Sequence, residues 1–292
     1  MDLSIFSHVV KGKTPEEVAR KTRAYGLRSV HLLPRQTDIG FGHDTSVVEA
    51  VFEHWAEAYH HEGVEISGIA GYINPLDPDP VRRQAGIGAF KSYLSGAKVL
   101  GCRDIATETG TYATAGAWDF DPRTRTPEAW EDLCRVTDEL LEVAVKADVT
   151  ILYEPYIMHV CHSPELGAQF VRQYNTTHLG LVMDPTNWFE VDDVRPELVP
   201  AIVQRGFAAE RGLFRVAHAK DVLPPEPGGT KPRLPEPGQG ILDYALYMRL
   251  LREHGYRGSI ILEHLAEPEI PRAIAYVQRF LNQDDVENRS TA

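Results

Sequence analysis

Four short apolar segments in the second half of the chain each lead without a break into a side chain that can bind a metal ion. The segments cover residues 150–153, 179–183, 213–217 and 259–262, and they are followed by Glu154, Asp184, His218 and Glu263. Short runs rich in Val, Ile and Leu are typical of buried parallel strands. The steps of roughly 30 to 45 residues between them leave room for one crossover helix each.

The first half of the chain repeats this alternation. Strands are predicted at Leu3–Val10, Ser29–Leu33, Glu65–Tyr72 and Asp104–Glu108. Thr-Pro and Asp-Pro pairs mark helix starts, and they predict helices over 14–26, 79–100 and 126–146, with a further helix over 45–61. In the second half the predicted helices are Pro164–Tyr174, Val194–Glu210, Tyr244–Gly255 and Pro271–Leu281.

Eight strands that alternate with eight helices predict an α/β protein, a single (β/α)8 barrel. A chain of 292 residues has the ordinary length for such a barrel, which we expect over residues 1–284, with 285–292 as a flexible tail. An open, doubly wound sheet is the alternative. It is disfavoured because no Gly-x-Gly-x-x-Gly motif follows the first predicted strand.

The barrel would bring the four polar residues together, because the C-terminal ends of its strands share one rim, where barrel enzymes do their chemistry. Three carboxylates and an imidazole cannot share a small volume as bare charges, since repulsion and desolvation would force protonation. A divalent cation resolves this conflict. Any one of these residues can also be an ordinary strand end that passes into a loop, but their joint occurrence favours a mononuclear metal site.

Composition limits the kinds of partner. The net charge of −12 and the absence of a stripe of Lys and Arg argue against binding of nucleic acid. No apolar run approaches the roughly 18–20 residues of a membrane span, and no basic segment precedes the first predicted strand, so we expect neither a membrane partner nor an export signal. Three widely spaced cysteines without a Cys-x-x-Cys motif indicate a reducing, cytoplasmic setting.

The segment 224–240 does not fit a plain barrel, because it is dense in Pro and Gly and too long for a tight turn. It follows the strand that carries His218, so it would lie over the mouth of the barrel. A disordered spacer is one interpretation. We favour an ordered active-site loop that shapes the substrate site.

Several motifs resemble the xylose isomerase-like superfamily, in particular its sugar phosphate isomerase/epimerase family. They are Tyr153-Glu-Pro, Ser163-Pro-Glu165, Met183-Asp-Pro-Thr-Asn187, Ala217-His-Ala-Lys-Asp221, Gly238-Gln-Gly and Leu262-Glu-His264. The resemblance covers nearly the whole chain and implies a barrel whose metal ligands are Glu154, Asp184, His218 and Glu263. The family includes D-tagatose 3-epimerase, hydroxypyruvate isomerase, inosose dehydratase, C-glycoside deglycosidase subunits and, more remotely, endonuclease IV.

The sequence departs from the ketose 3-epimerases of this family at two positions that touch substrate. They have an Arg six residues after the strand-seven His, where this chain has Pro224, and a His three residues after the strand-six Asp, where this chain has Asn187. We therefore expect the sugar to be held differently here. Endonuclease IV is disfavoured because its additional His ligands and its basic DNA surface are not visible.

The expected chemistry assigns roles to the rim residues. Oxygen ligands with one imidazole suit Mn²⁺ best, with Mg²⁺, Co²⁺, Fe²⁺ or Zn²⁺ as alternatives. Glu154 and Glu263 are candidate bases as well as ligands, although they can also be ligands only. The resemblance implies that His159 binds a hydroxyl or moves a proton. Candidates for substrate binding are Asn187, Lys220, Asp221, Glu108 and His31.

The sequence is compatible with two functions. The first is a metal-dependent isomerase or epimerase that acts on a carbonyl sugar through an enediolate. The second is a metal-dependent lyase that eliminates water or an aglycone from a keto-sugar. Both begin with proton abstraction beside a carbonyl, so the ligands do not separate them. The expected partner is a small sugar or keto-sugar, in a homo-oligomer, or in a hetero-oligomer if the chain is a C-glycoside deglycosidase subunit.

Overall fold

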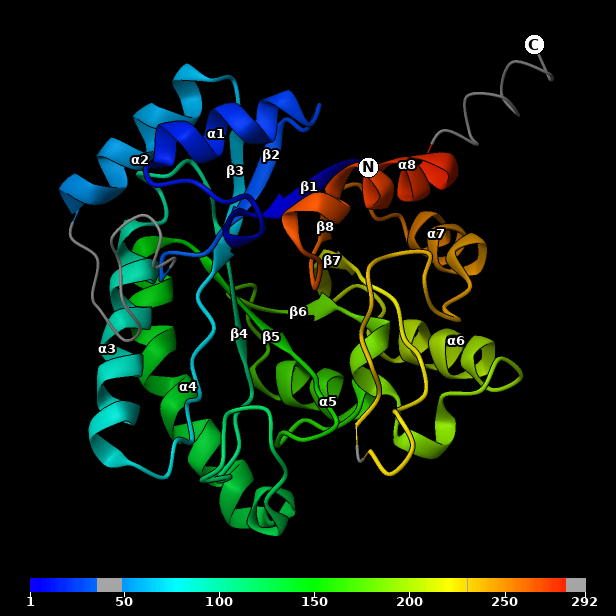
Figure 1. Cartoon of the computed structure of the whole chain (residues 1–292). Coiled ribbons are helices and arrows are strands. Elements are labelled where there is room, and N and C mark those ends of the chain that lie inside the picture. Colours follow the sequence, from blue (N-terminus) through cyan, green and yellow to red (C-terminus); the bar gives the residue numbers. More distant parts are fainter. Residues whose placement is uncertain (36–48, 230, 282–292) are drawn as a thin grey trace.

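The strands close into a barrel (Figure 1). The computed structural model describes residues 1–35, 49–229 and 231–281. Each strand pairs in parallel with its neighbours in sequence, and the last strand pairs with the first. The strands are β1 (Asp2–Phe6), β2 (Ser29–Leu32), β3 (Glu65–Ala70), β4 (Asp104–Glu108), β5 (Thr150–Glu154), β6 (Leu179–Met183), β7 (Phe214–Ala219) and β8 (Ser259–Leu262). The predicted (β/α)8 barrel is confirmed.

Helices surround the barrel as an outer ring (Figure 1). They are α1 (Pro15–Ala24), α2 (Glu49–His61), α3 (Pro80–Gly96), α4 (Pro127–Ala147), α5 (Pro164–Tyr174), α6 (Val199–Ala209), α7 (Tyr244–Glu253) and α8 (Ile270–Leu281). Side chains cap several of them as the sequence predicts. The carboxylate of Asp79 accepts from the first amides of α3, and the hydroxyl of Ser163 accepts from Leu166 in α5.

Several predicted boundaries differ from the structure, and two of the larger differences lie at the first strand and at α6. The first strand ends at Phe6, and a short 3-10 helix occupies Ser7–Val9, because the side chain of Ser7 accepts a hydrogen bond from the amide of Leu33 at 2.9 Å. The helix predicted from Val194 begins only at Val199. Residues 196–198 form a turn before the helix, in which the amide of Leu198 donates to the carbonyl of Arg195 at 2.9 Å. Residues 45–48 of a predicted helix and the tail 282–292 lie outside the described residues.

Within the described part of the chain, no helix is both long enough and apolar enough to span a bilayer. The apolar face of each helix packs on the barrel, and a single large cluster of buried side chains joins the strands to the helices. The barrel is therefore a rigid frame that holds its C-terminal rim in place.

Candidate metal centre and active site

Four strand ends bring Glu154, Asp184, His218 and Glu263 together. Glu154 ends β5, Asp184 follows β6, His218 lies in β7 and Glu263 follows β8. One ligand atom from each lies within 4.8 Å of all the others, and all four residues are buried. The Nδ1 atom of His218 lies 3.0 Å from Glu263 Oε1, 3.3 Å from Asp184 Oδ2 and 3.5 Å from Glu154 Oε1.

Charges inside this cluster are strongly coupled. Burial by itself would lower the pKa of the His218 imidazole, but the carboxylates of Glu263 and Glu154 outweigh it and raise that pKa well above its usual value. Burial would raise the pKa of Glu263, but His218 and Lys220 hold it well below its usual value. The ammonium of Lys220 lies 2.7 Å from Asp184 and 2.9 Å from Glu263. Three carboxylates are therefore balanced only in part by cationic side chains.

The donor set fits a hard or borderline divalent cation. Three carboxylates and one imidazole on four rigid strand ends are the ligand types that Mn²⁺, Mg²⁺, Co²⁺, Fe²⁺ and Zn²⁺ accept. Across residues 1–35, 49–229 and 231–281, no other group of three or more His, Cys, Asp or Glu side chains has this spacing. The buried negative charge that three carboxylates leave is what such a cation would neutralise.

Both oxygens of Glu154 accept hydrogen bonds from neighbouring side chains. The Tyr72 hydroxyl donates to Oε2 at 2.5 Å, and the amide of Asn187 donates to Oε1. We expected Asn187 to touch substrate, and the structure shows that it also orients Glu154. Sequence reasoning assigned no role to Tyr72. Its position at the end of the predicted third strand was the available signal, because that position places it on the rim.

Removing the Tyr72 hydroxyl should weaken metal binding, since side chains that orient a ligand typically contribute about 10–100-fold to metal affinity. We expect Tyr72→Phe to raise the Kd for Mn²⁺ by about that factor in calorimetric titrations of metal-free protein. Tyr156→Phe is the matched control, because Tyr156 also lines the cavity and none of its described contacts is with the four candidate ligands. Equal affinities for Mn²⁺ in both variants would show that the Tyr72 hydroxyl does not contribute to metal binding.

Not all of the other predicted rim residues face the space over the four candidate ligands. His31 is fully buried inside the barrel, where Gly68 makes room for it: a Cβ at Gly68 would lie 2.7 Å from the His31 ring. Burial lowers the pKa of His31 to about 3, with a smaller contribution from His218, so the ring is neutral. His31 therefore packs beneath the cluster.

His159 lies behind the cavity wall. It is fully buried, its Nε2 lies 2.7 Å from the carbonyl of Ala117, and Trp118 stacks on its ring. Burial lowers the pKa of His159 to about 4. Glu108 Oε2 lies 3.6 Å from this ring, and burial, followed by the charge of Glu154, raises the Glu108 pKa well above its usual value. His159 thus supports Trp118, Glu108 lies against His159, and neither of the two lines the cavity over the cluster.

Asp221 anchors the 224–240 loop. Its carboxylate accepts hydrogen bonds from the amides of Val222, Gly238 and Leu242, each at 2.9 Å. At the loop's far end Glu236 pairs with Arg272 of α8 at 2.6 Å. Within this segment Glu236 and Pro237 are buried, whereas 224, 226–229, 233 and 239 are exposed, and residue 230 is not described.

A cavity lies directly over the four candidate ligands and has two lobes. The first, of about 300 Å³, is lined by Phe6, Arg35, Tyr72, Glu154, Glu263 and neighbouring side chains. The second, of about 320 Å³, is lined by Tyr156, Asn187, Lys231, Pro232 and Leu234. Trp118, Lys220 and His264 line both lobes, so the two lie side by side.

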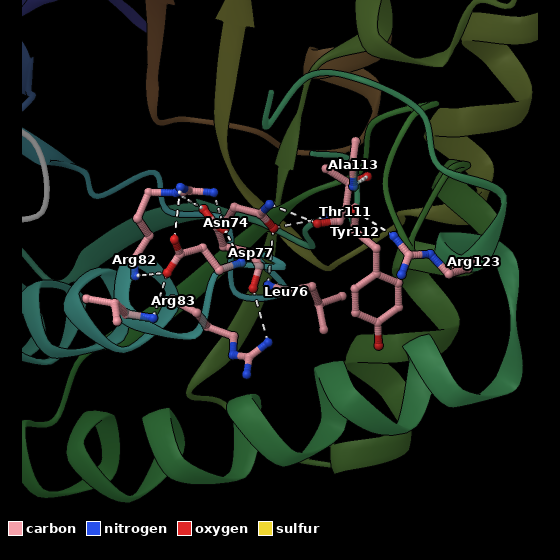
Figure 2. A network of polar contacts seen from close by, with 11 residues as sticks. Asn74, Leu76, Asp77, Arg82, Arg83, Thr111, Tyr112, Ala113 and Arg123 are labelled. Atoms are coloured by element: carbon pink, nitrogen blue, oxygen red, sulfur yellow. Dashed lines mark hydrogen bonds and ion pairs between the residues drawn. The ribbon is translucent and has the colours of Figure 1, made fainter. Parts of the chain in front are cut away.

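The loop that carries Trp118 is held by a polar network at the rim (Figure 2). Asn74, in the loop after β3, accepts from the amide of Thr111 at 2.9 Å and donates to its carbonyl at 2.8 Å. The Thr111 hydroxyl in turn donates to the carbonyl of Asp119 at 3.0 Å. Across the cavity, the ammonium of Lys231 pairs with the Asp119 carboxylate and donates to the carbonyl of Trp118 at 2.9 Å. Two loops from β4 and β7 thus meet over the cavity.

Breaking the Lys231–Asp119 pair should affect substrate capture more than stability. Both side chains are more than a third exposed, and such surface pairs contribute about 0–1 kcal/mol. We expect Lys231→Met to change the thermal midpoint little while it raises KM, because the loops no longer meet. Arg233→Met, on the same loop but paired with the exposed Glu226, is the control. A large loss of stability in Lys231→Met would show that the contact is structural.

The chain belongs to the xylose isomerase-like TIM barrel family, whose model matches residues 19–283. No curated protein matches it. Among solved structures, the 3-keto-D-glucoside 4-epimerase from E. coli is 15% identical, with a TM-score of 0.69, and the match covers 96% of this chain and 99% of that one.

Two further structures show the same fold. The IOLI protein with a bound zinc atom is 16% identical, with a TM-score of 0.69 and 97% of each chain covered. The probable 3-DHS dehydratase AsbF from Bacillus anthracis is 13% identical, with a TM-score of 0.69, and the match covers 97% of this chain and 100% of that one. The family resemblance inferred from the motifs is thereby confirmed, while identities this low indicate the fold alone.

Proposed function

We propose that this protein is a divalent-metal-dependent isomerase or epimerase that acts on a carbonyl sugar through an enediolate. The observation that carries the proposal is the convergence of buried ligand atoms of Glu154, Asp184, His218 and Glu263 within 4.8 Å of one another. Two of them, Glu154 and Glu263, also line that cavity. A bound cation, with Mn²⁺ our first choice, would act as a Lewis acid toward a substrate carbonyl and its neighbouring hydroxyl.

Proton transfer is assigned to two of the candidate ligands, Glu263 and Glu154. Both oxygens of Glu154 accept hydrogen bonds, one from Tyr72 and the other from Asn187. Glu263 instead contacts His218 and Lys220 through Oε1, and His264 lies 3.9 Å from its Oε2. Glu263 is thus the better candidate for the base that removes the carbon-bound proton, and Glu154 for the group on the other side of the substrate.

Lys220 is placed to bind a substrate oxygen. It lines both lobes of the cavity. Burial opposes its charge, but Asp184 and Glu263 outweigh burial and raise the pKa of Lys220, which keeps the ammonium protonated. We retain Lys220 and Asn187 as substrate-binding residues. The contacts of Asp221, Glu108, His31 and His159 favour supporting roles for those four.

Elimination remains a second candidate, and the second lobe of the cavity favours it, because a leaving group needs space beside the sugar. It begins with the same proton abstraction by a carboxylate, and it ends with loss of water or an aglycone. The relatives themselves include proteins described as an epimerase and as a probable dehydratase.

Product analysis in D₂O tests the proposal and separates the two reactions. Metal-loaded protein is incubated with a panel of ketoses and keto-glycosides, and products are followed by NMR and mass spectrometry. Solvent deuterium at carbon, with the composition otherwise unchanged, is expected for an isomerase or epimerase. Loss of water or of an aglycone would instead establish the lyase. If carbon-bound protons never exchange with any member of the panel, the proposal is wrong.

A further inference from the structure

The second lobe of the cavity is a separate compartment beside the candidate metal centre. None of the four candidate metal ligands lines it, and it shares Trp118, Lys220 and His264 with the first lobe. Each lobe, at about 300 Å³, reaches the lower end of the range of small-molecule sites, roughly 300–1,000 Å³. One lobe is enough for a monosaccharide, so the second has room for a further group.

Aromatic and aliphatic surfaces dominate this second lobe. Trp118 and Tyr156 meet edge to face with ring centroids 5.7 Å apart, and Pro232 and Leu234 of the loop also line the lobe. Trp118 is 49% exposed although it is a large apolar residue. Exposed aromatic surface at a pocket is typical of binding sites for flat or apolar ligands.

Charged and amide groups of the lobe already have partners within the protein. Lys231 pairs with Asp119, Lys220 pairs with Asp184 and Glu263, and the amide of Asn187 donates to Glu154. A charged ligand group would have to compete with each of these contacts. A neutral aromatic group would leave them intact and would bury the exposed face of Trp118.

We propose that the second lobe binds a neutral aromatic group joined to the sugar at the metal centre, so that the substrate is an aryl glycoside rather than a free monosaccharide. The assignment of the sugar to the first lobe rests on the proposed function. The assignment of the aromatic group to the second lobe rests on the residues that line it, and it can be tested without catalysis.

Calorimetric titration of the protein with 7-methoxy-4-methylcoumarin, an aromatic probe without an ionisable group, tests this assignment. We expect saturable binding with the same Kd in metal-loaded and metal-free protein, because the lobe contains no metal ligand. Leu234→Trp fills the lobe and Tyr156→Ala removes part of its wall, and each should raise the Kd about 10-fold or more, as expected when an apolar pocket is altered. Val145→Trp adds the same ring on the exposed face of α4 and should leave the Kd unchanged.

The absence of saturable binding, or an unchanged Kd in both lobe variants, would overturn the proposal. Tighter binding of inorganic phosphate than of the aromatic probe, lost in Lys231→Met, would also overturn it and would assign an anion to the lobe. A positive result with metal-free protein stands even if no proton exchange is found in D₂O. Failure of this inference is thereby distinguished from failure of the proposed function.

Discussion

Glu263→Gln is expected to lower turnover by about 10²–10⁴-fold at saturating metal, the usual loss when a general acid–base group is removed. The substituted amide keeps an oxygen that can coordinate a cation, so metal affinity should fall only modestly. It cannot accept a proton, however, and His218 and Lys220 would lose the charge that both now contact through Oε1. The measurement is kcat at a series of metal concentrations that reaches saturation.

Asp184→Asn is the matched control for this variant. Asp184 is fully buried and contacts His218 and Lys220 as Glu263 does, but it does not line the cavity. We therefore expect weakened metal binding and a loss of activity that excess metal partly restores. If Glu263→Gln instead regained near-normal turnover once metal was saturating, Glu263 would be a ligand only, and Glu154 would become the leading candidate for the base.

Complete removal of metal is expected to abolish activity, and added Mn²⁺ or Co²⁺ should restore it. Without a cation, the three buried carboxylates rely on side chains such as His218 and Lys220 for positive charge. A cation that binds only the folded state also stabilises that state, by about 2.7 kcal/mol at a concentration 100 times its Kd. The metal-free protein should therefore unfold several degrees lower in a thermal scan.

The control for this experiment is the Asp184→Ala, Glu263→Ala double variant, which removes two of the four candidate ligands. Its thermal midpoint should respond little to added Mn²⁺. Full turnover in protein shown by elemental analysis to be metal-free would contradict the proposed function, whatever the effect on stability.

Much of the fold could be read from local patterns. The boundaries of β4, β6 and α5 agree with the sequence predictions, because apolar runs, Thr-Pro or Ser-Pro starts and cap residues act over a few neighbouring positions. The errors at Ser7–Val9 and at the start of α6 lie where local turns and contacts replace the regular pattern: Ser7 accepts from the amide of Leu33, and Leu198 donates to the carbonyl of Arg195 in a turn before the helix.

The four candidate ligands could also be located from sequence, since parallel strands in a barrel must end at one rim. The positions of the side chains around these ligands could not be predicted from the sequence. Tyr72 reaches Glu154 from 82 positions away, and His159 turns toward the carbonyl of Ala117, 42 positions away, instead of toward the cavity. Asp221 was expected at the substrate, but its oxygens accept from the amides of Gly238 and Leu242.

The sequence by itself thus determined the barrel and the convergence of Glu154, Asp184, His218 and Glu263, because strand periodicity and the parallel arrangement follow from local order along the chain. Only the tertiary structure decided which rim side chains face the cavity and which support it. The orientation of these side chains depends on how the loops after β3, β4 and β7 fold over the rim and contact one another. Contacts between residues so far apart in the chain leave no periodic signal in the sequence.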